Sequence, residues 1–299
     1  MNKILVSGLL NVETSVMVDA FPIEYAPIEY PFFGVDTFVS GVGFNLAKAL
    51  KILGSEIDLL GQVGNDLPGS MVCAELNRNE IDTSLCRIIH DMKTPTSVVL
   101  VDKMGKRKIY CDLKDIQDRP PLDEMSVDLT KYSLVALTNI NFNRKLLNVA
   151  KIKGVPIATD VHVLGSLDDE YNQDFLQNAD ILFLSNEAIR GKEGDFLREI
   201  YQRFHNEIIV CGCGEEGALM YLGKEGSFVY APAVAPYGVV STVGAGDALF
   251  ASFLHFYSKG NDLESCLKKA VLFAGIKIHQ KGGSNGFVSE AELERLFAS

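Results

Sequence analysis

Short apolar runs alternate with amphipathic segments along most of the chain. The apolar runs are four or five residues long, as expected of buried strands, and lie at Ile4–Ser7, Ile57–Gly61, Leu134–Leu137, Pro156–Asp160, Ile181–Leu184 and Ile208–Cys211. Apolar residues recur at helical spacing in Asn45–Leu53, Gly69–Arg78, Arg144–Lys153 and Glu193–Phe204. Strands and helices that alternate in this way form a mostly parallel sheet with crossover helices on its faces. The pattern therefore predicts an α/β fold.

Two stretches, residues 12–39 and 94–113, break this alternation. The first is rich in Phe, Tyr and Pro and has no helical period. In the second, two β-prone runs flank Asp102–Gly105, where Gly105 supplies the positive φ of a turn. We expect the two stretches to form a small projecting sheet, which is either an ordinary edge hairpin or a lid. Long insertions without helices are usually functional in compact domains, and this favours the lid.

The composition excludes several classes of protein. The chain has 299 residues, of which 47% are apolar, and shows no repeat or Pro-, Gly- or Ser-rich linker, so we expect one globular domain over residues 1–299. The net charge of −11 argues against a surface for nucleic acid. No run is long and apolar enough to cross a bilayer, and the first is too short for a signal peptide. We therefore expect neither a membrane nor a nucleic acid as partner.

The six cysteines are scattered, with one close pair at Cys211 and Cys213. No C-x-x-C motif is present, so the spacing does not predict a structural zinc site. This usage is typical of reduced thiols, and we expect a cytoplasmic protein.

A glycine turn precedes an apolar helix expected at Ala248–Tyr257. The turn reads Ser-Thr-Val-Gly-Ala-Gly-Asp and ends at Asp247. A helix N-terminus leaves backbone N–H groups free, and these attract anions such as a phosphoryl group in transfer. Asp247 would lie beside that group as a base for an attacking hydroxyl. Taken alone, the pattern favours the simpler interpretation, in which Asp247 only stabilises the helix N-terminus.

The same turn resembles the C-terminal signature of the ribokinase (PfkB) family of carbohydrate kinases, D-T-x-G-A-G-D, with Ser241 in place of the first Asp. The resemblance implies a ribokinase-like three-layer α/β/α sandwich with a mostly parallel sheet and a small β-sheet lid. It also implies that Asp247 is the catalytic base and that Gly244, Ala245 and Gly246 form the catalytic turn. In the family, the replaced Asp helps to organise a monovalent cation, so potassium activation stays open.

A second signature lies near the N-terminus. Residues 40–54 resemble the family's G-G-x-x-x-N-x-A-x-x-L-x-x-L-G. Gly41 and Gly43 permit close backbone approach to a ligand, and Asn45 offers a donor and an acceptor to hydroxyls. Glu13 stands where the family's G-x-x-N-x-D motif places an Asp that binds substrate, so it is either a substrate contact or a solvated carboxylate. The substrate-binding candidates are Asn11, Glu13, Gly41, Val42, Gly43, Asn45 and Asn139.

Three further segments resemble nucleotide-binding parts of the family. The motif A-D-(strand)-x-N-x-x-E fits up to Asn186, but its final Glu falls on Ile189, and Glu187 is a possible substitute. Residues 212–218 fit G-x-G-x-x-G but continue as a strand, which argues against a nicotinamide dehydrogenase and matches the family's nucleotide hairpin. Residues 280–285 resemble a loop over adenine. The nucleotide-binding candidates are Asn186, Gly212, Gly214, Gly217, Thr242, Lys281 and Gly282.

The resemblance covers nearly the whole chain and implies an ATP- and magnesium-dependent kinase that phosphorylates a hydroxyl of a small sugar. It identifies no metal ligand. The aromatic pair Phe32 and Phe33 leaves a nucleoside open as the acceptor. The departures at Ser241 and Ile189 leave open a non-catalytic ligand-binding or regulatory member. Because lids of this family often pair, a homodimer through the lid is a further expectation.

Overall fold

The computed structural model describes residues 2–119 and 127–298, so residues 1, 120–126 and 299 of the predicted domain lie outside it. In the described residues, the main sheet has the strand order β13-β12-β11-β10-β9-β8-β1-β4-β5. Neighbouring strands run parallel from β5 to β11, and β12 and β13 are antiparallel at one edge. The strands are β1 Ile4–Ser7, β4 Ile57–Gly64, β5 Cys86–Ile89, β8 Leu134–Leu137, β9 Ile157–Val163, β10 Ile181–Ser185, β11 Ile208–Gly212, β12 Gly217–Leu222 and β13 Ser227–Pro232.

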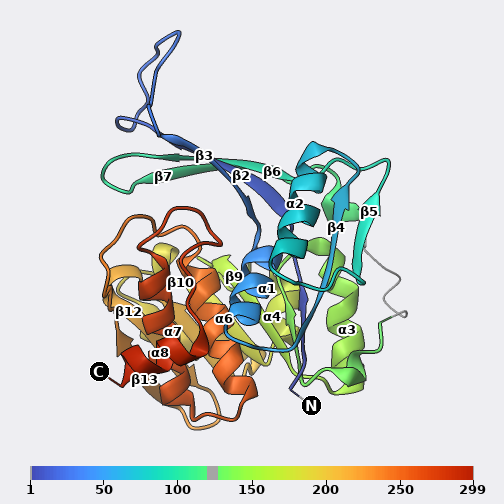
Figure 1. Ribbon diagram of the computed structural model, residues 1–299. Helices are drawn as coiled ribbons and strands as arrows, with labels where there is room; N and C mark the ends of the chain where they lie inside the picture. The colour runs from blue at the N-terminus through green and yellow to red at the C-terminus, as the bar shows by residue number, and fades with distance from the viewer. Residues whose placement is uncertain (1, 120–126, 299) are drawn as a thin grey trace.

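Helices cover both faces of this sheet (Figure 1). One face carries α1 Val42–Ile52, α2 Leu67–Arg78, α6 Ala245–Ser258, α7 Leu263–Lys277 and α8 Glu290–Phe297. The other carries α3 Arg144–Lys153, α4 Gln173–Asn178 and α5 Glu193–Phe204. Short 3₁₀ turns lie at Ile116–Asp118, Leu129–Lys131, Asn141–Asn143, Asn186–Ala188 and Gly214–Glu216. The three-layer α/β/α sandwich expected from the sequence is confirmed.

The hydrophobic core is split by the sheet into two large clusters, one on each face. The interior strand β1 is buried along its whole length because it pairs with β4 and β8 and is covered on both sides. On the α6 face, the Phe183 ring lies 4.7 Å from that of Phe250 and 5.4 Å from that of Phe253. These aromatic contacts fix α6 against the sheet, and with it the turn that precedes α6.

All six predicted strands and all five predicted helices are present. One difference that bears on the site is at α1, which begins at Val42 rather than Asn45. Gly41 caps this helix with φ 98°. Gly43 lies inside the helix, and a Cβ added to it would come within 2.9 Å of three backbone atoms of Gly8. These glycines therefore bring the N-terminus of α1 against the loop that follows β1, which is a packing reason for them besides the ligand approach we expected.

A second sheet has the order β3-β2-β6-β7 and is built from β2 Asn11–Met17, β3 Val35–Ser40, β6 Thr96–Val101 and β7 Arg107–Asp112. The β6–β7 hairpin turns at Asp102, whose Oδ1 accepts from the amides of Met104 and Lys106 at 2.9 Å. Gly105 has the expected positive φ of 79°. The small sheet predicted from residues 12–39 and 94–113 is therefore present, and its role as a lid stays a prediction.

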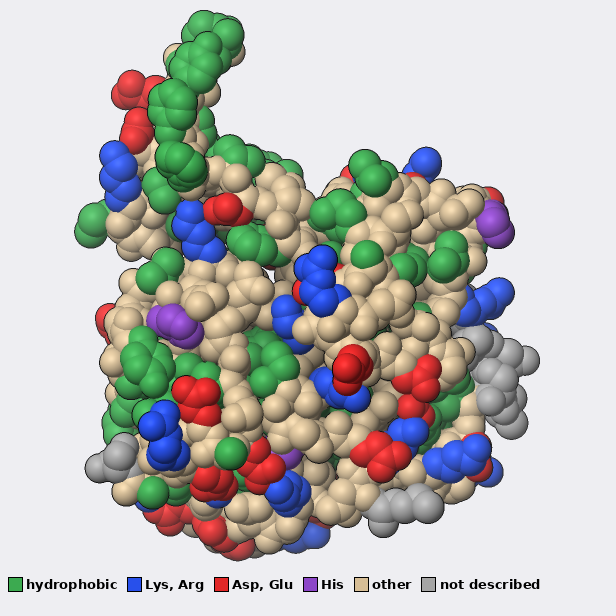
Figure 2. Space-filling view, in the orientation of Figure 1, with side chains coloured by type: hydrophobic (Ala, Val, Ile, Leu, Met, Phe, Trp, Pro, Cys, Tyr) green, Lys and Arg blue, Asp and Glu red, His purple; other side chains and the backbone are tan. Residues whose placement is uncertain are grey.

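The small sheet lies along one end of the main body, and the segment between β2 and β3 projects beyond it (Figure 1). We call this segment, residues 18–34, the arm. Its large apolar side chains are exposed, among them Tyr25, Phe32 and Phe33. In the space-filling view the arm is mostly apolar, and a groove separates the small sheet from the body on that face (Figure 2). No helix of the described residues has the length and apolar character needed to cross a bilayer.

Candidate active site

Chain segments far apart in sequence meet at the carboxyl edge of the main sheet. β1, β9, β10 and β11 run parallel and end at this edge, and the small sheet starts there at Asn11. Ligands of open α/β sheets bind outside the carboxyl ends of the strands. The N-termini of α1 and α6 meet here, as the hydrogen bond from Asn45 of α1 to Asp247 of α6 shows. This edge holds the candidate site.

Asp247 lies in the first turn of α6. The N-terminal cap residue of α6 is Gly244, which has φ 81°. Gly244 lies so close to the Gly283 backbone that a Cβ would clash. The Ala245 amide donates to the Thr242 carbonyl at 3.2 Å, while the next two amides of the helix have no partner inside it. Of the predicted catalytic turn, the amides of Gly246 and Asp247 are therefore available to an anion.

The Asp247 carboxylate is partly buried and accepts a hydrogen bond of 2.6 Å from Asn45 Nδ2. Burial raises its pKa above the usual value for an aspartate. The bond from Asn45 and the charges of His162 and Lys277 act in the opposite direction. A carboxylate whose pKa is raised is a better proton acceptor than an exposed one. Asp247 thus has the geometry and basicity of a candidate base.

Glu13 of β2 is 7% exposed, so it is not the solvated carboxylate of the simpler interpretation. Ser40 Oγ donates to Glu13 Oε2 at 3.3 Å, and burial raises the Glu13 pKa. The charge of Asp247 raises it further, which places the two carboxylates within electrostatic reach of each other. The carboxylates of Glu13 on β2 and Asp247 on α6 therefore lie close enough for each charge to influence the other.

Two buried amide oxygens beside these carboxylates lack a hydrogen-bond partner among the described residues: Asn11 Oδ1 and Asn45 Oδ1. The other end of each amide is fixed, since Asn11 Nδ2 donates to Ser97 Oγ at 3.0 Å and Asn45 Nδ2 donates to Asp247. An unsatisfied buried acceptor is costly unless a ligand or water donates to it. The pair of oxygens suits a ligand that carries hydroxyl groups.

The predicted nucleotide hairpin is formed by β11 and β12, with Gly212, Gly214 and Gly217 at its turn. Gly217 has φ 112°, and a Cβ there would collide with the Ala231 carbonyl. Next to the hairpin, Asn186 Nδ2 donates to Glu193 Oε1 at 2.8 Å. A small cavity of about 70 Å³ lies between them and is lined by Asn186, Arg190, Gly191, Glu193, Cys213, Glu215 and Glu216.

Polar contacts join the small sheet to the body at both of its edge strands, β7 and β3. Arg107 of β7 donates from Nη1 to Thr242 Oγ1 at 3.1 Å and from Nη2 to Glu187 Oε1 at 3.4 Å. On the other side, Lys281 forms a 2.9 Å ion pair with Asp36 of β3. Arg107 therefore contacts both the turn before α6 and Glu187, the residue after Asn186.

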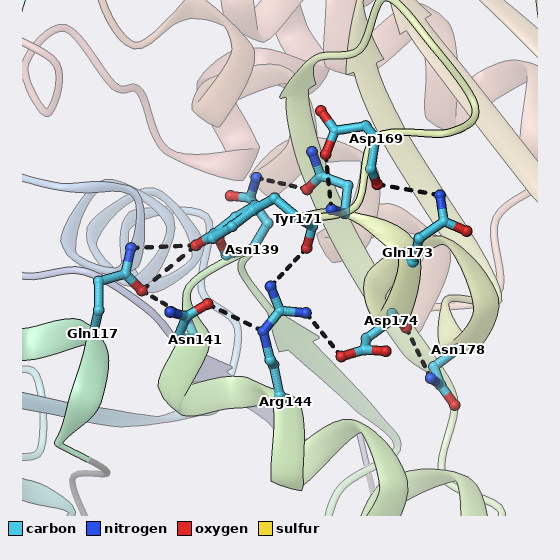
Figure 3. Close-up of polar contacts among 10 residues, drawn as sticks. Gln117, Asn139, Asn141, Arg144, Asp169, Tyr171, Gln173, Asp174 and Asn178 are labelled. Carbon is cyan, nitrogen blue, oxygen red and sulfur yellow. Dashed lines mark hydrogen bonds and ion pairs between the residues drawn. The ribbon is translucent and has the colours of Figure 1, made fainter.

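Asn139, the remaining substrate-binding candidate, belongs to a network of polar side chains at the end of β8 (Figure 3). Its Nδ2 donates to Asn172 Oδ1 at 3.2 Å, and its carbonyl accepts from the Tyr171 hydroxyl at 2.9 Å. Arg144 completes the network by donating to Asp174 at 2.8 Å and to the Tyr171 carbonyl at 2.6 Å. The Asn139 side chain is thus held by protein partners, and its predicted substrate contact remains untested.

The sequence profile described as "pfkB family carbohydrate kinase" matches residues 1–290. The chain belongs to the PfkB family. This match confirms the family that the motifs resemble. It also confirms the enzyme class that they predict, an ATP-dependent carbohydrate kinase.

Known relatives extend over most of this PfkB kinase. An uncharacterized sugar kinase of Archaeoglobus fulgidus is 28% identical over 254 residues, covering 79% of this chain and 97% of that protein. The ketohexokinase of Mus musculus is 24% identical over 292 residues, covering 94% and 97%. The solved structure of a microbiome-derived acarbose kinase, Mak1, has a TM-score of 0.87 at 24% identity and covers 99% of both chains. This structural likeness confirms the fold.

Sequence reasoning missed three residues of this site. Glu193 lies four positions beyond Ile189, the residue at the family's Glu position, which is itself buried in the core. The sequence places Arg107 in the hairpin of residues 94–113 and gives no indication that its side chain reaches the site. Lys277, at the end of α7, is fully buried and donates from Nζ to the Val243 carbonyl. A lysine directly after the apolar run 270–276 was the available signal for Lys277.

The Glu193 carboxylate, rather than one at position 189, is the acidic group in contact with Asn186. Burial works against its charge, but hydrogen bonds from Asn186 and from backbone amides outweigh burial and lower its pKa. Glu193 is therefore ionised at neutral pH. Neither Glu193 nor any other described carboxylate belongs to a group of three or more His, Cys, Asp or Glu that could enclose a metal ion.

Proposed function

We propose that this PfkB kinase transfers the γ-phosphoryl group of ATP to a hydroxyl of a small sugar, with Asp247 as the general base. The observation that carries the proposal is the pair of unpartnered oxygens of Asn11 and Asn45 beside the carboxylates of Glu13 and Asp247. Such a set accepts several hydroxyl protons at once, as a polyol requires. One of these hydroxyls would then lie at Asp247.

The reaction needs one proton transfer and one phosphoryl transfer. The acceptor oxygen attacks the γ-phosphorus as its proton passes to an Asp247 carboxylate oxygen, and the bond from the γ-phosphorus to the bridging oxygen of ADP breaks. The amides of Gly246 and Asp247 stabilise the charge of the phosphoryl oxygens. Arg107 at Thr242 is placed to add a positive charge from the small sheet.

The nucleotide is proposed to lie between the β11–β12 hairpin and the turn before α6, against Asn186, Gly212, Gly214, Gly217 and Thr242. Magnesium bound to the phosphates would neutralise their charge, as it does in phosphoryl-transfer enzymes. Magnesium commonly keeps several waters and takes only one or two protein carboxylates, so the absence of a protein cage among the described residues fits it. Asn186 and Glu193 are the residues proposed to face it, directly or through water.

A hexose, pentose and nucleoside panel with ATP and magnesium tests the proposal, with ADP release as the readout. We expect turnover with at least one sugar. Asp247→Asn should lower kcat by about 10²- to 10⁴-fold while ATP binding, measured by calorimetry, is unchanged. The matched control is Asp262→Asn, because Asp262 caps the neighbouring helix α7 by accepting from Ser265 N. Near-normal kcat in Asp247→Asn, or equal losses in both variants, would contradict the role of base.

A nucleoside acceptor has less support. Phe32 and Phe33, the aromatic pair considered for stacking on a base, are 85% and 96% exposed on the arm. They are not part of the set around Asp247. The panel also separates a non-catalytic member, which would bind ligands and ATP but release no ADP with any acceptor.

A further inference from the structure

Lys277 is 0% exposed, although lysine is almost never fully buried unless its charge is paired. Its Nζ donates to the carbonyl of Val243, the residue directly before the cap of α6. The two nearby carboxylates, Asp247 and Glu13, act on its charge through space rather than through a hydrogen bond. The ammonium group therefore lies beneath the turn that presents the free amides to a phosphoryl group.

A second buried lysine on the same helix shows what an ordinary structural lysine of this protein looks like. Lys269 is 6% exposed, but its Nζ forms a 2.6 Å ion pair with Glu294 and lies 4.4 Å from the centre of the Phe256 ring. It ties α7 to α8 near the C-terminus. Lys277 has no such carboxylate partner and contacts the catalytic turn instead.

The family resemblance implies a monovalent cation near position 241, and the residues present do not fit one. Potassium is bound by carbonyl and carboxylate oxygens, and Ser241 supplies no carboxylate. The amides of Val240 and Ser241 donate to the Ile278 carbonyl at 2.8 and 3.0 Å, so this segment lies against the residue next to Lys277. The Val243 carbonyl is already occupied by the Lys277 ammonium. A second cation beside it would meet a like charge and would have to share this carbonyl with the ammonium.

We propose that the Lys277 ammonium is a built-in monovalent cation, a positioning residue that holds the turn from Ser241 to Asp247 and makes phosphoryl transfer independent of added potassium. The inference rests on the proposed kinase function. Burial lowers the Lys277 pKa to about 8, so the group is still mostly protonated at neutral pH. Its charge helps Asp247 to stay ionised against burial and adds to the positive potential of the anion-binding amides.

The first experiment uses the unchanged protein. Melting temperature in the presence of MgATP, and ADP release with the best acceptor of the panel, are measured in potassium chloride and in tetramethylammonium chloride of equal ionic strength. We expect both readouts to agree between the two salts, with rates within about twofold. Activation by potassium of tenfold or more, or a potassium-specific rise in melting temperature, would overturn the proposal.

The second experiment removes the charge. Lys277→Met keeps the length of the side chain, and we expect kcat to fall at least tenfold while the acceptor KM changes less than threefold. Lys269→Met is the matched control, and its kcat should stay within twofold of the wild type even if its melting temperature drops. Lys277→Met with wild-type kcat would refute the proposal, and so would a loss of the same size in Lys269→Met.

The third variant combines Lys277→Met with Ser241→Asp, which removes the ammonium and restores the carboxylate of the family pattern. We expect potassium chloride, but not tetramethylammonium chloride, to raise its melting temperature. A double variant that ignores potassium would show that Lys277 does not occupy the place of a cation. This readout needs no acceptor, so it tests Lys277 even if no substrate is found, and the failure of the kinase proposal is told apart from the failure of this one.

Discussion

At the scale of single residues, the site is defined by charges that are buried without full neutralisation. Glu13 and Asp247 carry raised pKa values because burial disfavours their ionised forms. Lys277 carries a lowered pKa for the same reason. Each of these groups reduces the stability of the fold at neutral pH, and such costs are found where function requires the charge.

Glu13→Gln should therefore stabilise the protein at neutral pH. The stability that Glu13 contributes is present below its unfolded pKa of about 4.5 and is lost as pH rises through the higher pKa of the folded state. A neutral glutamine avoids that loss. By scanning calorimetry, we expect the variant to melt about 1–3 °C above the wild type at pH 7. At pH 4 the variant and the wild type should melt at the same temperature.

The exposed Glu56 is the control for Glu13, and Glu56→Gln should leave the melting temperature unchanged at both pH values. A lower melting temperature for Glu13→Gln at pH 7 would mean that the Glu13 charge is net stabilising. The same variant should bind the acceptor more weakly, because its amide replaces one hydroxyl acceptor with a donor.

Lys277 predicts opposite effects of pH on stability and on activity. Between pH 8 and pH 10.5, the unfolded chain binds a proton at Lys277 that the folded chain does not, so the Lys277 contribution to stability increases with pH. Turnover should fall over the same range, because the neutral amine no longer acts as the cation. Other groups also titrate here, so the wild type is compared with Lys277→Met at each pH.

The melting temperature of Lys277→Met minus that of the wild type should decrease from pH 7.5 to pH 9.5. The variant should also lack the decline of kcat above pH 8 that the wild type shows. A difference in melting temperature that stays constant over this range would place the Lys277 pKa outside it.

At the scale of elements, the parts of the fold that depend on local pattern could be predicted. The bounds of β1, β8, α3 and α5 agree with the sequence periodicity, and the β6–β7 hairpin follows from its turn sequence. The contacts that complete the site could not be predicted in this way. Arg107 meets Thr242 across 135 residues and Lys277 meets Val243 across 34, so these pairs exist only once the tertiary structure has formed.

The carboxylate next to Asn186 does not come from the position that the motif spacing indicates. The family's Glu position falls on Ile189, which faces the core, whereas the carboxylate that binds Asn186 comes from Glu193 at the start of α5. A linear motif assumes one backbone path between its residues. Here the turn after β10 is followed by a helix whose first residue returns to Asn186.

The strand β7 offers a test of the small sheet as a lid. Arg107→Met removes the two hydrogen bonds to Thr242 and Glu187, and a charged hydrogen bond is worth about 1.5–3 kcal/mol. We expect the KM for ATP to rise by about tenfold or more. Lys108→Met is the control, because the next residue of a strand points to the opposite face. An unchanged KM for ATP in Arg107→Met would exclude this contact from nucleotide binding.

At the scale of the whole molecule, the two sheets differ in how they are covered. Helices bury both faces of the main sheet, whereas the small sheet and its arm leave many apolar side chains in solvent (Figure 2). Tyr25, Phe32 and Phe33 are each more than 80% exposed on a segment that extends beyond the body. Apolar surface gathered in this way marks an interaction site more often than a free surface.

A second copy of the chain is the partner expected from the sequence, through the small sheets. Sedimentation velocity at micromolar concentration should then show a dimer. The triple variant Tyr25→Ser, Phe32→Ser and Phe33→Ser should sediment as a monomer with an unchanged far-UV spectrum, because it removes apolar area from the arm and leaves the strands intact. Ile152→Ser, which removes an exposed apolar residue of α3, should remain dimeric. A wild-type monomer at this concentration would contradict the expectation and would assign the arm to a different partner.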